Sequence, residues 1–261
     1  MTILRVKHVV KRFGGLIAVN GVQFDFQKGK ISAVIGPNGA GKTTFFNMIT
    51  GIYTPDEGEI ELEGKSIVNV KPDRITGKGI ARTFQNIRLF GNMTVIENVM
   101  VGMHIHLRGG IVSTLLGFTK TRLEEQQAMD QAYRLLQYVG LASYLNENAN
   151  SLSYGAQRRL EIARALAAKP KVLLLDEPAA GMNPSETKDL TELIRRIQRE
   201  MDISIILIEH DMKLVMELSD HILVLDHGEK IAEGSPHEVR ANPRVIEAYL
   251  GKSALTEEVK L

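Results

Sequence analysis

The sequence predicts an α/β fold: a β-sheet core that carries an inserted α-helical subdomain. Three observations support this fold. The first third of the chain alternates apolar and polar residues, the middle third has a helical pattern, and short continuous apolar runs mark buried strands. Strands that alternate with helices are typical of a sheet covered by helices.

Two segments of the first third, 22–27 and 59–63, alternate apolar and polar residues with period two. They are predicted to be half-buried strands, with Gly29 and Gly64 as turn residues. Between them, "SAVIG" (32–36) is a continuous apolar run, as expected of a strand that is buried on both faces.

The stretch from about 95 to 166 is predicted to be helical, because Leu135, Leu136 and Val139 form an apolar stripe among charged neighbours. The segment 104–120 contains three glycines, which predicts a flexible connection between helices.

The last third returns to strands. The runs "VLLLD" and "ISIILIEH" are predicted to be buried strands, separated by a helix at about Pro184–Met201. Residues 221–234 are expected to form a hairpin that turns near His227 and Gly228.

Length and composition limit the possible classes of protein. The chain has 261 residues, enough for one large domain, and a formal net charge of +1, which gives no sign of a nucleic-acid or anionic-membrane partner. It has no cysteine, so disulfides and thiolate metal sites are excluded. Charges interrupt its first residues, so no signal peptide is expected, and its apolar runs are too short to span a bilayer.

The segment Gly36–Thr44, "GPNGAGKTT", matches the phosphate-binding pattern G-x-x-x-x-G-K-[ST] in full. An apolar strand precedes it, and "TTFFNMIT" supplies the helix that follows, with Gly51 as its expected carboxyl-terminal cap. The glycines let the backbone turn its N–H groups toward phosphate oxygens. The alternative is a glycine-rich turn that matches by chance, and the correct flanking elements disfavour it.

Four side chains have predicted roles at this phosphate site. Lys42 is expected to hold the β- and γ-phosphates, and the Thr43 hydroxyl is expected to bind Mg²⁺. Asp176, at the end of a buried strand, suits a water-mediated contact with Mg²⁺, and Glu177 is placed to polarise an attacking water. The alternative is that Asp176 and Glu177 are an acidic pair at a helix start, with Pro178 in the first turn.

A second candidate anion site begins "LSYGAQRRLEIARAL" (152–166). Ser153 stands before a helical run, where it is expected to be the N-cap, and the unpaired N–H groups of a first helical turn attract anions. Gly155 would allow an anion to approach the backbone closely. One chain thus carries two phosphate-binding signals.

These residues together resemble the ATP-binding-cassette (ABC) family over nearly the whole chain. Gln85 in "TFQN" is similar to the family's Q-loop glutamine, "LSYGAQ" to its signature, and His210 in "ILIEHD" to its switch histidine. Each piece alone has an ordinary explanation, since a lone glutamine is normally a surface residue and a lone histidine after a strand is more often structural. The resemblance depends on five motifs in this order: the phosphate loop, Gln85, the signature, the pair Asp176 and Glu177, and His210.

The resemblance implies a P-loop, RecA-like core with a mostly parallel sheet and an amino-terminal antiparallel β subdomain. These would lie within a single ABC ATPase domain at residues 1–250, followed by a tail at 251–261. The core would comprise 1–86 and 165–250. The helical subdomain, with the signature, would comprise 87–164.

The resemblance also implies three groups of site residues for ATP and Mg²⁺. The expected ATP-binding residues are Phe13, Val19, Gly36, Asn38, Gly39, Ala40, Gly41, Lys42, Thr43 and Thr44. The expected catalytic residues are Lys42, Glu177 and His210, and the expected metal-site residues are Thr43, Gln85 and Asp176. The residues expected to face the ATP of a partner subunit are Ser153, Tyr154, Gly155, Ala156 and Asn183.

In this family, two subunits associate head to tail, and each of two ATP molecules is buried between the phosphate loop of one subunit and the signature helix of the other. The resemblance implies that Mg-ATP binding closes the pair, that Glu177 orients the attacking water, and that His210 contacts the γ-phosphate. Hydrolysis would loosen the pair. The second anion site would therefore serve a neighbour's γ-phosphate.

The chain departs from the commonest family pattern at four positions. In the usual signature, LSGGQ, a glycine stands at Tyr154 and the glutamine at Ala156, while the serine and second glycine are kept here. Phe13 replaces a tyrosine that often stacks on adenine, and a phenyl ring can also stack. The alternative is that Phe13 is an aromatic residue of a strand, buried in the core. Asn183 replaces the usual D-loop aspartate and keeps hydrogen-bonding capacity.

The branch most similar to this chain is the ATP-binding subunits of branched-chain amino-acid importers, on the segments "ARTFQNIRLFGNMTVIENVMVG", "EPAAGMNPSE" and "NPRVIEAYLG". The implied partners are a second ABC ATPase subunit, identical or related, transmembrane permease subunits and, indirectly, a substrate-binding protein, with no nucleic acid. The implied location is cytoplasmic, peripheral on the inner face of the cell membrane. The segment 104–120 would border the groove for a membrane subunit or form a longer helical hairpin.

Two other ABC roles remain open: the ATPase subunit of a lipid or polysaccharide exporter, and a soluble ABC switch in translation or DNA maintenance. The presence of one phosphate loop without sustained heptads disfavours the soluble switch. A P-loop kinase would not account for Ser153, Glu177 and His210 together. The sequence does not identify the cargo.

Because Ala156 lacks the amide of the usual glutamine, we expect weaker nucleotide-driven association than with LSGGQ. The substitution Ala156→Gln is predicted to raise the ATPase rate, measured as steady-state phosphate release. An unchanged rate would contradict this explanation.

Overall fold

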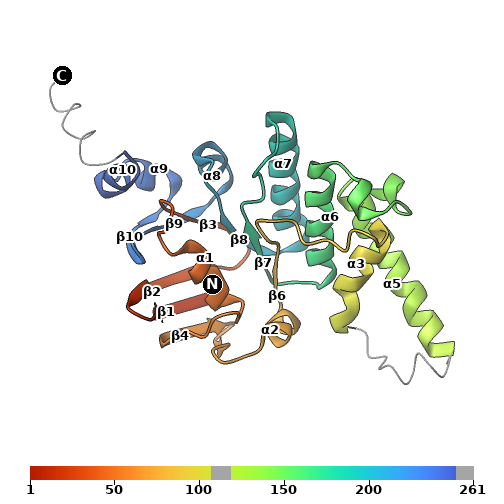
Figure 1. Ribbon diagram of the computed structural model, residues 1–261, viewed down its shortest axis with the longest axis horizontal. Coiled ribbons are helices and arrows are strands. Elements are labelled where there is room, and N and C mark those ends of the chain that lie inside the picture. Colours follow the sequence, from red (N-terminus) through yellow and green to blue (C-terminus); the bar gives the residue numbers. More distant parts are fainter. Residues whose placement is uncertain (107–118, 251–261) are drawn as a thin grey trace.

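The computed structural model describes residues 1–106 and 119–250. Two β-sheets lie side by side, and helices α3, α5 and α6 gather at one end of the molecule, with α6 next to β6 and β7 (Figure 1). The helices are α1 Lys42–Ile49, α2 Pro72–Lys78, α3 Val95–Met103, α5 Thr119–Tyr138, α6 Tyr154–Ala167, α7 Pro184–Met201, α8 Met212–Leu218, α9 Pro236–Arg240 and α10 Pro243–Leu250.

The larger sheet has six strands in the order β10-β9-β3-β8-β7-β6, and all neighbours are parallel except β10 and β9. Its strands are β3 Ile31–Ile35, β6 Ile80–Arg82, β7 Val172–Asp176, β8 Ser204–Ile208, β9 His221–Asp226 and β10 Glu229–Gly234. Every residue of β3, β7 and β8 is buried, as their continuous apolar sequence predicts. The predicted hairpin at 221–234 is confirmed.

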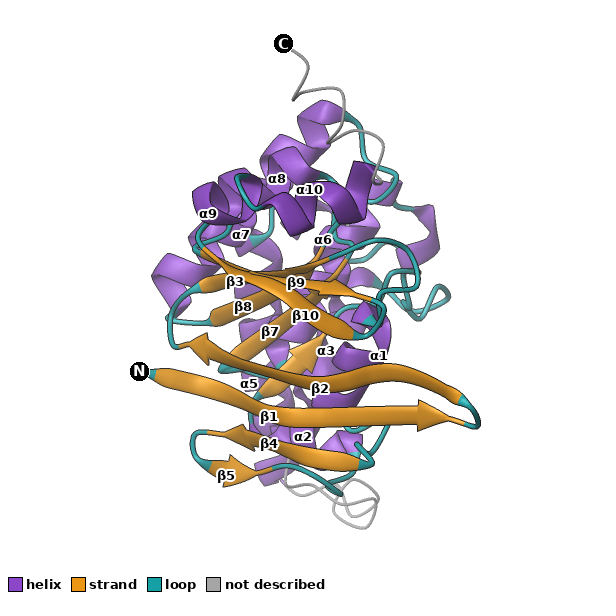
Figure 2. Cartoon of the chain, turned by 90° about the vertical axis from the view of Figure 1, so that its left-hand side faces the viewer, coloured by secondary structure: helices purple, strands orange, loops and turns teal. Residues whose placement is uncertain are grey.

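The smaller sheet is antiparallel, in the order β2-β1-β4-β5. Its strands are β1 Thr2–Phe13, β2 Leu16–Gln27, β4 Glu57–Leu62 and β5 Lys65–Ser66. Figure 2 shows this sheet as a separate layer beside the six-stranded sheet. Phe45 and Phe46 of α1 lie in the same apolar cluster as Val6 of β1 and Val34 of β3, so α1 fills the space between the layers.

On the other face of the six-stranded sheet, one apolar cluster contains buried residues of α7 and α8, and the helical subdomain adjoins the sheet through α6. Leu173 and Leu175 of β7 share an apolar cluster with Val99 of α3, Leu136 of α5 and Leu160 of α6, whereas the alternate β7 residues belong to the α1 cluster. This alternation is that of a strand buried on both faces. The glycines predicted to interrupt the helices at 109, 110 and 117 lie outside the described residues.

Helix α6 extends from the helical subdomain toward β7, so the expected boundary between residues 164 and 165 falls within one continuous helix. Gly51 follows the Thr50 cap of α1 with φ 72° and donates its N–H to Met48 O, as expected of a glycine at this position. Among the described residues, no helix combines the length and apolarity needed to cross a membrane.

Helix α7 occupies the range that the sequence predicts. Asn183 and Glu186 form a capping box at its start, with Pro184 as its first residue. Leu190, Leu193, Ile194 and Ile197 recur at helical spacing and are its buried apolar side chains.

The substitution Ile194→Ala is predicted to lower the free energy of unfolding by about 2–5 kcal/mol, because the side chain is fully buried and its removal leaves a cavity. Urea denaturation followed by circular dichroism measures this loss. Lys188→Ala, on the exposed face of the same helix, should change the free energy by less than about 0.5 kcal/mol. Equal losses in the two variants would show that α7 is not packed as described.

Candidate functional site

Four loops meet where the parallel strands end. The phosphate loop 36–44 follows β3, Gln85 follows β6, Glu177 follows β7, and His210 follows β8. The carboxyl ends of parallel strands lie at one edge of a sheet, where open α/β sheets bind their ligands. The sheet order β3-β8-β7-β6 therefore brings together motifs that are far apart in the sequence.

Glycine is required at both ends of the phosphate loop. A Cβ at Gly36 would lie 2.0 Å from Leu225 O, and one at Gly41 would lie 2.3 Å from Ala18 O. Gly39 and Gly41 also have φ of 81° and 93°, which side chains disfavour. The backbone can take this path only without side chains there.

Lys42 is buried at the start of α1, and its Nζ donates to Gly36 O at 2.7 Å and to Pro37 O at 2.8 Å. Burial lowers the pKa of Lys42, and the negative charges of Glu177 and Asp176 oppose this shift. Thr43 and Thr44 complete the first turn of α1, whose unpaired N–H groups favour an anion. The predicted phosphate-binding residues Gly36, Asn38, Gly39, Ala40, Gly41, Lys42, Thr43 and Thr44 thus form one continuous loop and helix start.

The Glu177 carboxylate lies between side chains from two neighbouring loops. His210 Nε2 is 2.6 Å from Glu177 Oε1, and Gln85 Nε2 donates to Glu177 Oε2 at 2.8 Å. The Glu177 side chain is only 15% exposed. Both carboxylate oxygens are engaged, so the orientation of the carboxylate is fixed. Gln85 and His210 are therefore not the isolated surface and structural residues of the alternative interpretation.

The backbone at Glu177 has φ 46°, a left-handed conformation that is uncommon for a residue with a side chain. Its N–H donates to Ile208 O of β8 at 2.9 Å, which ties this turn to the neighbouring strand. The next helix begins only at Pro184. The alternative in which Asp176 and Glu177 start a helix is therefore wrong.

Glu209 is a buried carboxylate that sequence reasoning missed. It accepts hydrogen bonds from the N–H groups of Ala179, at 2.8 Å, and His210, at 3.1 Å. Burial raises the pKa of Glu209, and these hydrogen bonds oppose the rise. Glu209 thereby joins the loop after β7 to the backbone of His210. Its position beside the histidine is the only sequence signal for this role.

Asp176 has a partner that the sequence analysis did not identify. Arg82 donates to Asp176 Oδ2 at 2.6 Å, and both side chains are less than 8% exposed. The same guanidinium donates to Asn47 Oδ1 of α1 at 2.7 Å. Arg82 therefore fixes Asp176 relative to the helix that follows the phosphate loop.

The oxygen atoms available near the phosphate loop suit Mg²⁺. Thr43 offers a hydroxyl, Asp176 a carboxylate, and Gln85 an amide oxygen, since its nitrogen already binds Glu177. No group of three or more His, Cys, Asp or Glu side chains placed to hold a metal occurs in the described part of the chain. In nucleotide sites, Mg²⁺ takes much of its coordination from phosphate and water.

Phe13 ends β1 and is 41% exposed, so it is not a core aromatic. Its ring meets Tyr53 edge to face, with centroids 5.1 Å apart, and Lys11 Nζ lies 5.5 Å from its centroid. The ring is open enough to stack on a planar group. Val19, in contrast, is fully buried and supports the loop at Gly41.

Ser153 is the N-cap of α6, and its Oγ accepts from Ala156 N at 3.4 Å. Tyr154 is 44% exposed, whereas Gly155 is buried with Glu186 beside it. Ala156 is 5% exposed and lies in an apolar cluster. A glutamine at 156 would have to displace buried neighbours, so the structure disfavours the gain in ATPase rate expected of Ala156→Gln from the sequence alone.

Asn183 has a local structural role. Its Oδ1 accepts from Ser185 N and Glu186 N at 3.0 Å, which caps α7. Gly181, in the same loop, faces the Tyr154 ring: a Cβ there would lie 3.3 Å from a ring carbon. The signature residues and the loop before α7 thus form one surface.

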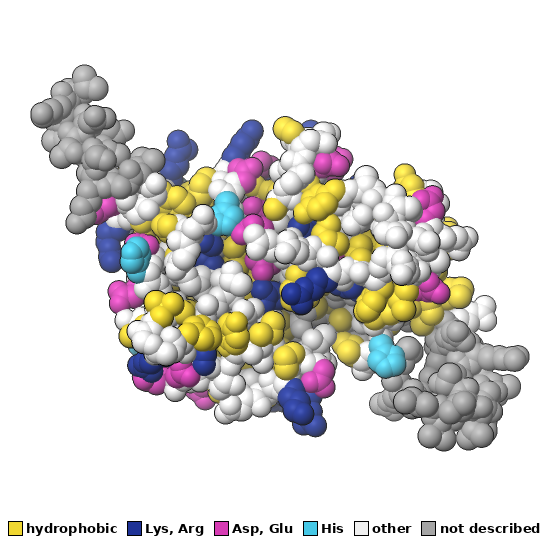
Figure 3. Space-filling view, in the orientation of Figure 1, with side chains coloured by type: hydrophobic (Ala, Val, Ile, Leu, Met, Phe, Trp, Pro, Cys, Tyr) yellow, Lys and Arg dark blue, Asp and Glu magenta, His cyan; other side chains and the backbone are white. Residues whose placement is uncertain are grey.

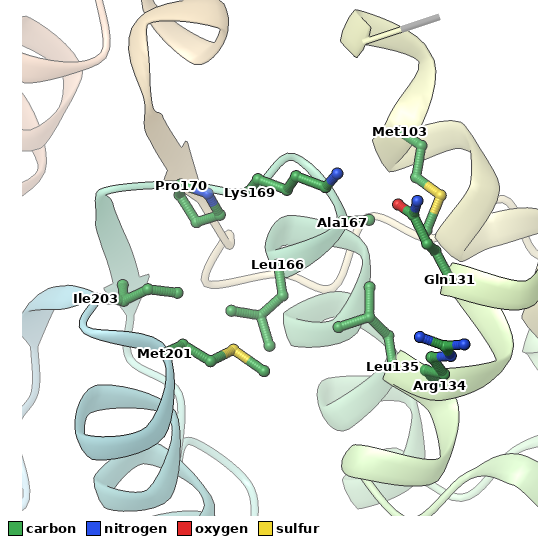
Figure 4. Close-up of a pocket in the computed structure, with 10 residues that line it drawn as sticks. All are labelled: Met103, Gln131, Arg134, Leu135, Leu166, Ala167, Lys169, Pro170, Met201 and Ile203. Atoms are coloured by element: carbon green, nitrogen blue, oxygen red, sulfur yellow. The ribbon is translucent and has the colours of Figure 1, made fainter. Parts of the chain in front are cut away.

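A separate hollow of about 550 Å³ lies near Pro170 and Ile203, just before β7 and β8, at the edge opposite the phosphate loop. Figure 4 shows Leu135, Leu166 and Met201 directed toward one another across it. Its position separates it from the four loops described above.

Comparisons with known proteins agree with this geometry. Residues 19–180 match the sequence profile described as "ABC transporter", and residues 229–254 match that of the branched-chain amino acid ATP-binding cassette transporter. The high-affinity branched-chain amino acid transport ATP-binding protein BraF of Pseudomonas aeruginosa is 48% identical over 251 residues, 96% of this chain and 98% of that protein.

Two solved structures are also similar. A nucleotide-free ATP-binding cassette from an ABC transporter is 34% identical, with a TM-score of 0.84, over 97% of this chain and all of that chain. The dimeric structure of MJ0796, a bacterial ABC transporter cassette, is 25% identical, with a TM-score of 0.76, over 89% of this chain and 98% of that chain. The chain therefore belongs to the ABC transporter family, with the P-loop ATPase fold that its sequence predicts.

Proposed function

We propose that this chain hydrolyses ATP to drive an importer of branched-chain amino acids. The observation that carries the proposal is the convergence of Lys42, Asp176, Glu177 and His210 at one edge of the parallel sheet. The named transport role of the full-length relative and the match of residues 229–254 favour import of amino acids over the exporter and soluble-switch alternatives.

The proposed reaction depends on positioning and charge. Lys42 and the N–H groups of the phosphate loop bind the phosphates, which places the γ-phosphate near the fixed carboxylate of Glu177. Glu177 accepts a hydrogen bond from water and polarises it for in-line attack. His210 holds this carboxylate and contacts the γ-phosphate. Thr43, Gln85 and, through a water, Asp176 would hold Mg²⁺, which would supply neutralisation of phosphate charge.

The ATP site is proposed to be completed by a second ATPase subunit. Ser153 and Gly155 begin α6 with unpaired N–H groups, and they share a surface with the loop before α7. The related MJ0796 cassette is described as dimeric. We infer that Ser153, Tyr154 and Gly155 face the nucleotide of the partner, which is a second copy or a related chain. The buried Ala156 and the α7 cap Asn183 would support this surface from within.

A permease subunit is proposed to dock in a groove of about 380 Å³ between α2, β6, α3 and α6. Its hydrophobic lining residues Ile52, Phe90, Val101 and Ile105 are each between 38% and 47% exposed. Hydrophobic side chains gather over α3 on the face shown in Figure 3. Such exposed apolar surface is typical of a protein contact, and docking there would hold the chain at the inner face of the membrane. The glycine-rich part of 104–120 that was expected to border a groove lies outside the described residues.

The substitution Glu177→Gln is predicted to lower kcat for ATP hydrolysis by about 10²–10⁴-fold, because the amide cannot polarise water as the carboxylate does. ATP binding should be retained, since the phosphate loop is unchanged. Phosphate release and equilibrium binding of a labelled ATP measure the two effects. Glu192→Gln, on the exposed face of α7, is the matched control. Normal turnover in Glu177→Gln would remove the proposed role of Glu177.

The substitution Val101→Glu is predicted to reduce co-purification with the permease subunits by about tenfold, because a charge enters the apolar groove. Met129→Glu places the same charge on an exposed α5 position outside the groove and should preserve the complex. Quantitative co-purification from membranes measures both. Equal retention of the two variants would place the permease contact elsewhere.

A further inference from the structure

The segment Phe84–Arg88 leaves the six-stranded sheet and contains Gln85. Thr83 N still donates to Leu174 O of β7 at 2.9 Å, so the sheet holds the chain up to this residue. Beyond it, Arg158 of α6 donates to Phe84 O at 2.6 Å and to Gln85 O at 2.9 Å. The backbone is therefore bound by β7 up to Thr83 and by α6 from Phe84 onward.

The far end of the segment is also held by α6. Glu161 accepts a hydrogen bond from Arg88 N at 3.2 Å, and the Arg164 guanidinium donates to Arg88 O. Arg158, Glu161 and Arg164 are three residues apart in sequence, so they form one stripe along the helix. This stripe binds four backbone groups of a segment that has no regular structure of its own.

Two of the three members of the stripe are fully buried. Arg158 and Glu161 are 0% exposed, and Arg158 donates to Glu161 Oε2 at 3.2 Å. Burial raises the pKa of Glu161, and the Arg88 N–H and the Arg158 charge oppose the rise. A buried pair of this kind cannot lose one partner without leaving an uncompensated charge, which ties both side chains to one geometry.

Arg158 also reaches the signature end of the helix. It donates to Tyr154 Oη at 3.1 Å, and the Tyr154 ring faces Gly181. A tyrosine here, in place of the glycine common in the family, thus gives the arginine a further partner. One guanidinium connects the signature residue Tyr154 with the backbone of Gln85.

We propose that Arg158 is a positioning residue that fixes the backbone of Gln85 to α6, so that α6 sets where the Gln85 amide meets Glu177. This inference rests on the proposed function. Gln85 donates to Glu177, so the position of α6 would control a contact of the proposed catalytic carboxylate. It would also place residues 84–86 with the helical subdomain rather than the core.

The test uses Arg158→Met/Glu161→Met, which removes both buried charges together. Amide hydrogen exchange in residues 84–88 should rise by about tenfold, while exchange in α7 stays unchanged. The kcat for ATP should fall by about tenfold as Gln85 loses its position. KM should stay within about twofold, since the phosphate loop is intact. Arg195→Met, which removes an exposed ion pair with Glu217, is the control and should match wild type in exchange, kcat and KM.

Fast exchange in residues 84–88 with an unchanged kcat would overturn the proposal. A fall in kcat together with a rise in KM and faster amide exchange throughout the chain would also overturn it. If the double variant does not fold, the single variant Arg158→Lys provides the test. Lysine keeps the charge beside Glu161 but lacks the planar fork that binds two carbonyls, so intermediate exchange and kcat are expected. Wild-type amide exchange and wild-type kcat in Arg158→Lys would overturn the proposal. If the wild-type chain assembled with its partner subunits did not hydrolyse ATP, that result would instead contradict the proposed function. The exchange result would still test whether Arg158 holds residues 84–88 to α6.

Discussion

The parallel pairing of β7 with β6 on one side and β8 on the other is the constraint on which the site depends. It places Gln85 and His210 on either side of Glu177 at hydrogen-bond distance. Side chains alternate between faces along a strand, so a slip of one residue in either pairing would disrupt the arrangement. The strands are apolar and buried on both faces, which stabilises this register.

Local sequence signals predicted the elements of this site well. Helix α7 has the predicted range because Asn183, Pro184 and Glu186 mark its start and an apolar stripe continues through it. The phosphate loop was predicted because its glycines, lysine and threonine lie within nine consecutive residues between a strand and a helix. Patterns that occupy one short segment can be recognised without knowledge of tertiary contacts.

Contacts between distant segments were not predicted. Arg82 and Asp176 are 94 residues apart, and Arg158 binds the carbonyl of Phe84 from 74 residues away. A charged residue in a sequence is most often exposed, so nothing local marks these arginines as buried. Ala156 shows the same limit: the motif comparison indicated a missing amide, whereas the structure shows a buried position that favours a small side chain. Burial depends on what packs against a residue, and that is set by the fold.

The central claim is that Glu177 and His210 act as one unit across β7 and β8. A double-mutant cycle on kcat, with Glu177→Gln, His210→Ala and the combined variant, tests this claim most directly. Residues that act together have non-additive effects, so the combined variant is predicted to be no more than about threefold slower than the slower single variant. If the fold-reductions in kcat of the two single variants multiply in the combined variant, Glu177 and His210 act independently. That result would contradict their action as one unit.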